Sequence, residues 1–323
     1  MLTDPDPGDP SSGDPRPGGL SAGSEQPERR VRWRLIALGL YATAFVITAV
    51  ALGLPAGRDR LIFWVLGALV LASIGQERGP SRLIRDFVPL VAVLTAYDFL
   101  KGRTYGITGH VYTYPQIRVD ELLFGGTVPT VTLQRWFYTP GSPHLWDYLM
   151  VLVYLSYFFV PLITAALLWK FAYQWFGRFA LMLILLAAMA LITYALFPAD
   201  PPWLAARHHD IPEVSRIIKG LAADMHIRMG RAFGSKSTLV NPIAAVPSLH
   251  FAVTTSLLLF FWPLTKRWRW LLVAYPIAMG VALVYLGEHY VLDLLVGAVY
   301  AVIAYTASNT IVDRWRRTRS ATG

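Results

Sequence analysis

The chain alternates between long apolar stretches and short connectors that carry basic or aromatic residues. An α-helix of about 20 apolar residues crosses the roughly 30 Å hydrocarbon layer of a membrane. Because a helix satisfies its own backbone hydrogen bonds in lipid, we interpret the stretches as transmembrane helices. Eight are predicted, at residues 33–54, 61–76, 83–100, 146–169, 179–197, 246–264, 270–287 and 290–312.

The second and third stretches have the shortest apolar cores, and the third begins beside Arg85 and Asp86. A re-entrant or interfacial course is the alternative for these two. Since they are consecutive, either course leaves the orientation of the other helices unchanged. The predicted fold class is therefore an all-α integral membrane protein with about eight transmembrane helices.

The segment before the first stretch is built from Pro, Gly, Ser and Asp. It offers almost no apolar side chain to bury, so nothing would offset the entropy lost on ordering its backbone. We expect residues 1–32 to form a disordered cytoplasmic tail and residues 33–323 to form a single membrane domain. The tail does not resemble a signal peptide, because the first apolar run starts only near Trp33 and further spans follow it.

Lys and Arg are unequally distributed between the two sides of the predicted bundle. Each short connector on the side of the amino terminus is basic, and so is the carboxyl-terminal segment. Cytoplasmic connectors of membrane proteins carry this excess, so both termini are predicted to be cytoplasmic. The two long connectors, 101–145 and 198–245, are then extracytoplasmic.

Composition supports a membrane protein and narrows its chemistry. Hydrophobic residues make up 55% of the 323 residues and charged residues 15%, whereas soluble domains contain about 25% charged residues. Much of the net charge of +9 is explained by topology, and the chain has no basic soluble module, which argues against nucleic-acid binding. The absence of Cys excludes disulfides, thiolate metal sites and Cys nucleophiles.

Three ionisable residues stand at the outer ends of predicted helices, where membrane burial makes such residues costly and marks them as candidates for function. His250 starts the sixth helix, and His289 lies between the seventh and eighth, with Asp293 four residues later. Two helices separate the histidines, so both lie at the same membrane face. Four residues span about one helical turn, so His289 and Asp293 share a helix face.

This trio suits covalent phosphoryl transfer. A carboxylate bonded to one imidazole nitrogen fixes the tautomer and leaves the other nitrogen free to attack phosphorus. A second histidine opposite can protonate the leaving oxygen. The alternative is that the histidines are interfacial hydrogen-bonding residues and that Asp293 is a carboxylate favoured by the helix dipole.

The surrounding residues resemble the second and third signature motifs of the type-2 phosphatidic acid phosphatase superfamily, Pro-Ser-Gly-His and Ser-Arg-x5-His-x3-Asp. The chain has Pro-Ser-Leu-His at 247–250, and His289 followed by Asp293. Leu249 replaces the motif glycine, Ala282-Leu283 replaces Ser-Arg, and the Lys-x6-Arg-Pro first motif is not found. These departures resemble the branch that contains inositol phosphorylceramide synthase and its bacterial relatives. Further segments resemble that branch, at 120–125, 154–161 and 197–203.

The resemblance implies a six-helix phosphatase-type core with its catalytic part at about 197–300. It implies that His289 is the nucleophile, that Asp293 orients it, and that His250 acts first as general acid and then as general base. Ser248, with the amides at the start of its helix, would bind phosphate oxygens.

Because the motif arginines are missing, other cations must neutralise the phosphate. The second long connector supplies the candidates for substrate binding. Lys236 and the pair Arg228 and Arg231 are preferred, beside Arg207 and Lys219.

We expect an integral-membrane phosphotransferase that needs no metal or cofactor and works at the extracytoplasmic face. It would move a phosphorylated head group, with inositol phosphate as a candidate, from a phospholipid donor to a hydroxyl of a lipid or a lipid-linked glycan. A lipid phosphate phosphatase, acting on phosphatidate or polyprenyl phosphate with water as acceptor, is the alternative enzyme. A transporter or scaffold would show inverted repeats or polar residues near the midplane, and the sequence shows neither. Donor, acceptor and oligomeric state stay open.

Overall fold

The structure, a computed structural model, describes residues 25–52, 58–74, 79–101, 110–224 and 243–321. These residues form twelve α-helices. They are α1 (Glu25–Leu52), α2 (Arg58–Ser73), α3 (Pro80–Lys101), α4 (Tyr114–Leu123), α5 (Pro129–Phe137), α6 (Leu145–Phe171), α7 (Tyr173–Leu196), α8 (Pro202–Arg207), α9 (Ile217–Asp224), α10 (Leu249–Phe261), α11 (Arg269–Tyr285) and α12 (Val291–Ala321).

Each predicted apolar stretch corresponds to a helix, namely α1, α2, α3, α6, α7, α10, α11 or α12. Among the described residues, three helices are long and apolar enough to cross a membrane: α6, α7 and α12. The apolar parts of α1, α2, α10 and α11 are shorter, at 10–17 residues. The all-α class is confirmed, whereas the number of about eight spans stays a prediction.

The first helix begins earlier than the sequence predicted. Residues 25–32, assigned above to the disordered tail, form the first two turns of α1. The segment is rich in Glu, Gln and Arg, which have high helix propensity, and its Pro27 falls in the first turn, where proline is tolerated. Helix propensity therefore favours order here even though few apolar side chains are available to bury. The rest of the predicted tail, residues 1–24, lies outside the described residues.

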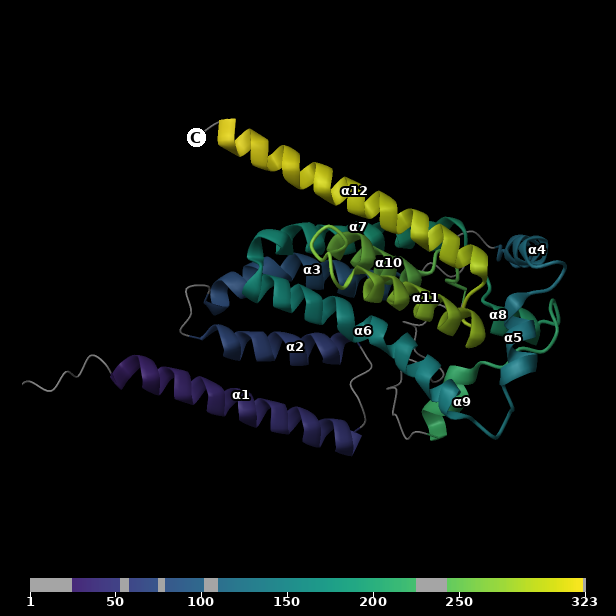
Figure 1. The fold of residues 1–323 in the computed structure, drawn as a ribbon, viewed down its shortest axis with the longest axis horizontal. Helices are drawn as coiled ribbons and strands as arrows, with labels where there is room; N and C mark the ends of the chain where they lie inside the picture. Colours follow the sequence, from purple (N-terminus) through teal and green to yellow (C-terminus); the bar gives the residue numbers. More distant parts are fainter. Residues whose placement is uncertain (1–24, 53–57, 75–78, 102–109, 225–242, 322–323) are drawn as a thin grey trace, which may run out of the picture.

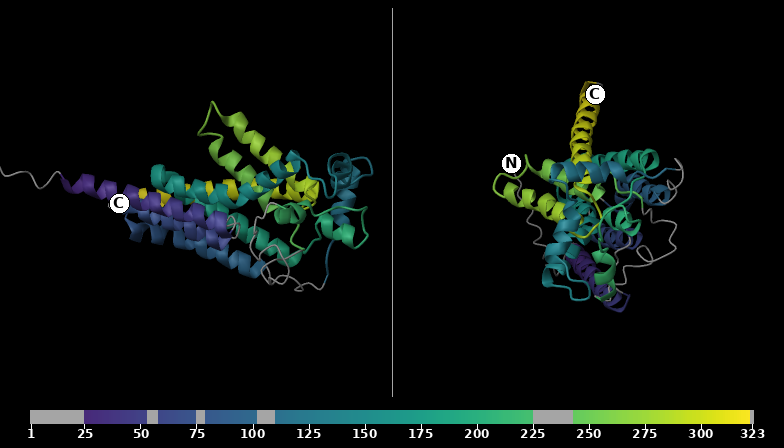
Figure 2. Two further views of the ribbon diagram at one scale, coloured as in Figure 1. Left: turned by 90° about the horizontal axis from the view of Figure 1, so that it is seen from below. Right: turned by 90° about the vertical axis from the view of Figure 1, so that its right-hand side faces the viewer.

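The long helices lie side by side in a bundle, and the four short helices α4, α5, α8 and α9 gather at one end of it (Figure 1). The view from below in Figure 2 shows the same grouping. Within the bundle, α10 packs against α7, α11 and α12, while α6 packs against α7 and α11. The short helices come from the two long connectors, so they form a cap over one end of α11 and α12.

The bundle is apolar both inside and outside. Val151, Phe179 and Met279 are fully buried between the helices. Leu152 and Ile192 nevertheless point outward and are 64% and 59% exposed. Since lipid tails are as apolar as Leu, such an outer surface suits a bilayer rather than water.

The cap holds the link between α11 and α12, residues 286–290, in place. The Gln134 side chain of α5 donates to the carbonyl of Tyr285 at 2.8 Å and to that of Ser215 at 3.0 Å, and it accepts the Ser215 amide at 2.8 Å. Gly287 in the link has a φ of +80°, which a residue with a side chain adopts only with strain. A Cβ there would also lie 3.1 Å from the Ser215 carbonyl. The link is therefore fixed by close backbone packing.

Candidate active site

His289 and Asp293 form a hydrogen-bonded pair where the link enters α12. His289 Nδ1 lies 3.1 Å from Asp293 Oδ2, and because an ionised carboxylate only accepts, Nδ1 carries the hydrogen. The same oxygen accepts the backbone N–H of Tyr290 at 2.9 Å. Asp293 is fully buried and His289 is 7% exposed. The contact expected from the four-residue spacing thus forms, and it leaves His289 Nε2 available.

His250 faces this pair from the first turn of α10. The ring centroids of His250 and His289 are 6.0 Å apart. Tyr154 and Tyr157 of α6 pack against the His250 ring, with centroid distances of 4.5 and 4.0 Å. The structure therefore brings together the three residues that the sequence placed at one face of the membrane.

The two histidines are held at this separation by close contact between the starts of α10 and α12. The Ser248 amide donates to the Asp293 carbonyl at 3.0 Å. A Cβ at Gly297 would lie only 2.6 Å from the Ser248 carbonyl oxygen, so the close approach requires glycine there. From α7, the Tyr194 hydroxyl donates to the Pro247 carbonyl at 2.8 Å.

Ser248 is fully buried and serves as the N-cap of α10. Its hydroxyl oxygen accepts the Phe251 amide at 3.4 Å, which satisfies one of the free donors in the first helical turn. The expected contact of Ser248 with phosphate stays a prediction.

A cation that the sequence analysis missed is bound to Glu288, the residue that precedes His289. Arg216 forms a bidentate salt bridge with Glu288. Its Nε lies 2.7 Å from Oε1 and its Nη2 lies 3.1 Å from Oε2. Its guanidinium also lies 4.4 Å from the centroid of the Trp203 ring. Burial opposes the charge, but the Glu288 carboxylate outweighs this and raises the pKa of Arg216. The guanidinium is thus a fixed positive charge bound to the residue that precedes the candidate nucleophile.

No sequence signal marked Arg216 among the basic residues of its connector. Its partner Glu288 is 72 residues away, and no periodicity or motif links the two positions. The cap brings them together, because Gln134 binds the backbone of Ser215, which precedes Arg216.

The cations that the sequence did single out have different positions. Lys236, Arg228 and Arg231 lie outside the described residues. Arg207 is exposed, with its guanidinium 5.3 Å from the centroid of the Trp203 ring. Lys219 is exposed on α9.

Asp120 of α4 is a second residue whose role only the structure shows. Its carboxylate accepts the backbone amides of Val291 and Leu292 at 3.0 and 3.1 Å, and these are free donors at the start of α12. Burial raises the pKa of Asp120 to about 6, against the opposing effect of these two hydrogen bonds. Asp120 thus anchors the helix that carries Asp293.

The arrangement is capable of two-step transfer chemistry. His289 has one ring nitrogen oriented by a buried carboxylate and one nitrogen free, which is the requirement for a nucleophilic imidazole. His250 stands opposite at a distance suited to exchange a proton with a group bound between the rings. Arg216 is bound to Glu288, the residue before His289, and the amides at the start of α10 are donors that favour an anion beside His250.

Comparison with known protein families agrees with an all-helical membrane bundle that carries this site. The profile of the PAP2 superfamily matches residues 119–307, more than half of the chain and the whole of the site described above. The protein belongs to this superfamily. Membership supports a multi-pass integral membrane protein and an enzyme of this superfamily.

Within the superfamily, the chain is similar to the inositol phosphorylceramide synthase catalytic subunit AUR1 of Saccharomyces cerevisiae. The two are 32% identical over 122 residues. The matched region covers 34% of this chain and 29% of the yeast protein. No solved structure matches the chain. The resemblance inferred from the motifs is confirmed.

Proposed function

We propose that the protein is a phosphotransferase that moves a phosphorylated head group from a phospholipid to a hydroxyl of a lipid or a lipid-linked glycan. The observation that carries the proposal is the pairing of His289 with the buried Asp293 directly opposite His250. The similarity to the yeast synthase supports inositol phosphate as the transferred group.

In the first step, His289 Nε2 attacks phosphorus and the bond between phosphorus and the lipid oxygen breaks. His250 in its protonated form gives its proton to the departing oxygen, so a lipid alcohol leaves. The product is a phosphohistidine whose positive imidazole is stabilised by Asp293 through Nδ1–H.

In the second step, the neutral His250 takes the proton from the acceptor hydroxyl. The acceptor oxygen attacks phosphorus, the phosphorus–nitrogen bond breaks, and His289 is restored. At the end of the cycle His250 is protonated again and His289 Nε2 has regained its lone pair. The proposed steps therefore need no metal or cofactor.

The phosphate is held by Arg216, by the amides at the start of α10 and by Ser248, the N-cap residue of that helix. Arg216 presents three further N–H groups besides the two that Glu288 engages, since a guanidinium carries five. Arg207, Arg228, Arg231 and Lys236 of the same connector are further candidates for contacts with the head group.

The site lies at the extracytoplasmic face in this proposal, and both termini are cytoplasmic. The basic connectors support this orientation. Labelling of single cysteines introduced into the Cys-free chain tests it: a cysteine in the 198–245 connector should react with an impermeant maleimide in intact cells, and one near the carboxyl terminus should not.

The proposed reaction is tested with purified protein in lipid nanodiscs and phosphatidylinositol labelled in its inositol ring. Transfer predicts label in a new lipid-soluble product when lipid acceptors are present. A lipid phosphate phosphatase, with water as the acceptor of the same phosphohistidine, is the second candidate, favoured by the name of the superfamily. Label that appears only in water-soluble inositol phosphate would refute transfer. Absence of any turnover of phosphatidylinositol would refute it as the donor.

A further inference from the structure

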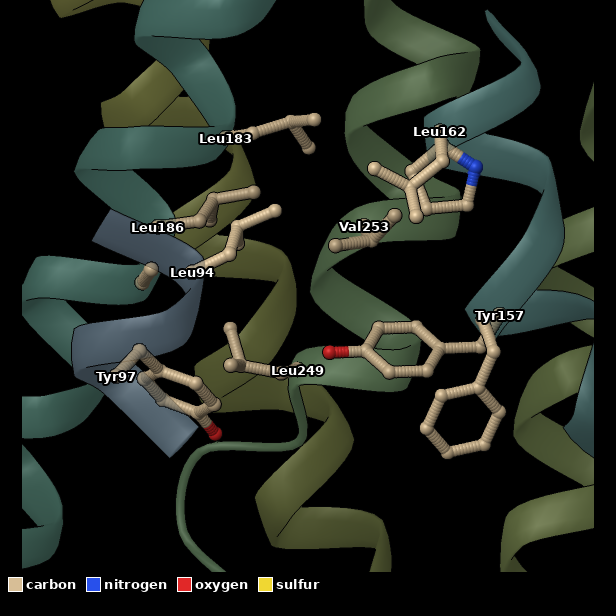
Figure 3. Close-up of a pocket in the computed structure, with 11 residues that line it drawn as sticks. Leu94, Tyr97, Tyr157, Leu162, Leu183, Leu186, Leu249 and Val253 are labelled. Carbon is tan, nitrogen blue, oxygen red and sulfur yellow. The ribbon is translucent and has the colours of Figure 1, made fainter. Parts of the chain in front are cut away.

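An apolar pocket lies between α3, α6, α7 and α10 (Figure 3). The free space among its lining residues is about 470 Å³ when the part open to the surroundings is counted. The side chains that line it are hydrocarbon except for the hydroxyl groups of Tyr97 and Tyr157. None of the residues around it carries a charge, so the pocket suits a hydrocarbon and does not suit a head group.

The pocket adjoins the candidate active site through Tyr157. Tyr157 lines it and also packs against His250, with ring centroids 4.0 Å apart. Leu249, which directly precedes His250, lines its outer end. From there the pocket follows α10 to Val253, a distance of about 6 Å along the helix axis. It therefore starts at the level of His250 and runs into the bundle.

The sequence of α6 gives a physical reason for this gap between helices. Pro161 lies inside the helix and lines the pocket. Proline has no amide hydrogen to donate to the carbonyl four residues earlier, and its ring crowds that carbonyl. The carbonyl belongs to Tyr157, so the backbone hydrogen bond that Pro161 removes lies at the wall of the pocket. On the opposite wall, α7 presents the short side chain of Ala187.

We propose that this pocket holds a hydrocarbon chain of the lipid alcohol whose oxygen His250 protonates. The inference rests on the proposed function and adds the place where one substrate chain is bound. A lipid with its oxygen at His250 and its head group in the cap directs its chain inward, along the course of the pocket. Since a bilayer is as apolar as the pocket, binding there adds little affinity. It positions the reacting oxygen and selects chains by length and shape.

The proposal is tested by a substitution that fills the pocket with a larger side chain. Ala187→Leu places a larger side chain in the gap, and Ala188→Leu is the matched control, because Ala188 is the next residue of α7 and is exposed on the outside of the bundle. Turnover is measured with dipalmitoyl and dibutyryl phosphatidylinositol. Ala187→Leu should lower the ratio of kcat/KM for the long-chain over the short-chain donor by about 10-fold or more, as expected for misfit in an apolar pocket. Ala188→Leu should leave the ratio unchanged.

An unchanged ratio in an Ala187→Leu protein with an unchanged unfolding temperature would overturn the proposal, whether activity is retained or is lost equally with both donors. Photo-crosslinking of the wild-type protein provides a test that does not depend on folding of the variant or on turnover. A phospholipid with a diazirine in its chain should label residues of the pocket wall, such as Val253. Labelling confined to outward-facing residues such as Ile192 would contradict the proposal. Labelling of the wall without turnover of phosphatidylinositol would refute the donor and leave the pocket assigned.

Discussion

Removal of the Arg216 guanidinium is the most direct test of how the site binds phosphate. The side chain is 22% exposed, and its ion-pair partner Glu288 is 10% exposed. Arg216→Gln keeps much of the length and the hydrogen-bonding capacity of the side chain and removes the charge. The change therefore tests the charge bound to Glu288 with little loss of packing.

The expected effect follows from the contacts. A hydrogen bond to a charged group contributes about 1.5–3 kcal/mol, which corresponds to a decrease of about 10- to 150-fold in kcat/KM. Arg216→Gln also leaves the largely buried Glu288 carboxylate without its cation, where it repels the incoming phosphate. We therefore expect a decrease near the upper end of this range, and partial recovery in the double variant Arg216→Gln/Glu288→Gln.

The assay is the transfer or hydrolysis of labelled phosphatidylinositol by purified protein, with the unfolding temperature measured in the same detergent. Arg135→Gln is the control, because Arg135 is an exposed arginine of the cap on α5. Arg216→Lys should also lose activity, because an ammonium group keeps the charge and cannot reproduce the planar two-pronged geometry. Activity of Arg216→Gln within a factor of about two of the wild type would refute phosphate binding by Arg216. Full recovery in the double variant would show that Arg216 only neutralises Glu288.

The other predictions concern the nucleophile, the helix contact and the anchor of α12. His289→Ala should lower turnover by about 10⁴-fold or more in a folded protein, and unchanged turnover would refute the mechanism. Any adduct trapped on His289 in a His250→Ala protein should be an acid-labile phosphoryl group that still carries the donor's head group, detectable by mass spectrometry. Gly297→Ala should reduce stability by about 1–3 kcal/mol and lower activity, because its Cβ would press on the Ser248 carbonyl oxygen; an unchanged unfolding temperature would contradict this. Since the folded-state pKa of Asp120 is raised to about 6 from 3.8, the folded protein binds this proton more tightly than the unfolded chain. The free energy of unfolding should therefore fall as pH rises between these values. Chemical denaturation of Asp120→Asn should show a smaller slope in that interval.

The helices and the central trio could be predicted because their signals are local. The apolar stretches predict α6, α7 and α12 directly, since a run long enough to cross lipid has few alternatives. The depth of His250 and His289 follows from counting helices between them. The contact of His289 with Asp293 follows from their spacing of four residues. These inferences need chain order and helix geometry, and they need no knowledge of which helices are neighbours.

Contacts between distant segments were decided by the tertiary structure. Arg216 and Glu288 meet across 72 residues, and Asp120 caps a helix that starts 171 residues later. The pocket next to Tyr157 likewise depends on four helices meeting around Pro161. Sequence by itself determined the membrane class, the helices and the reactive trio, because burial in lipid and helical spacing act locally. The structure alone decided that Arg216 binds Glu288 and that an apolar pocket lies next to Tyr157, because both depend on how the cap and the bundle pack.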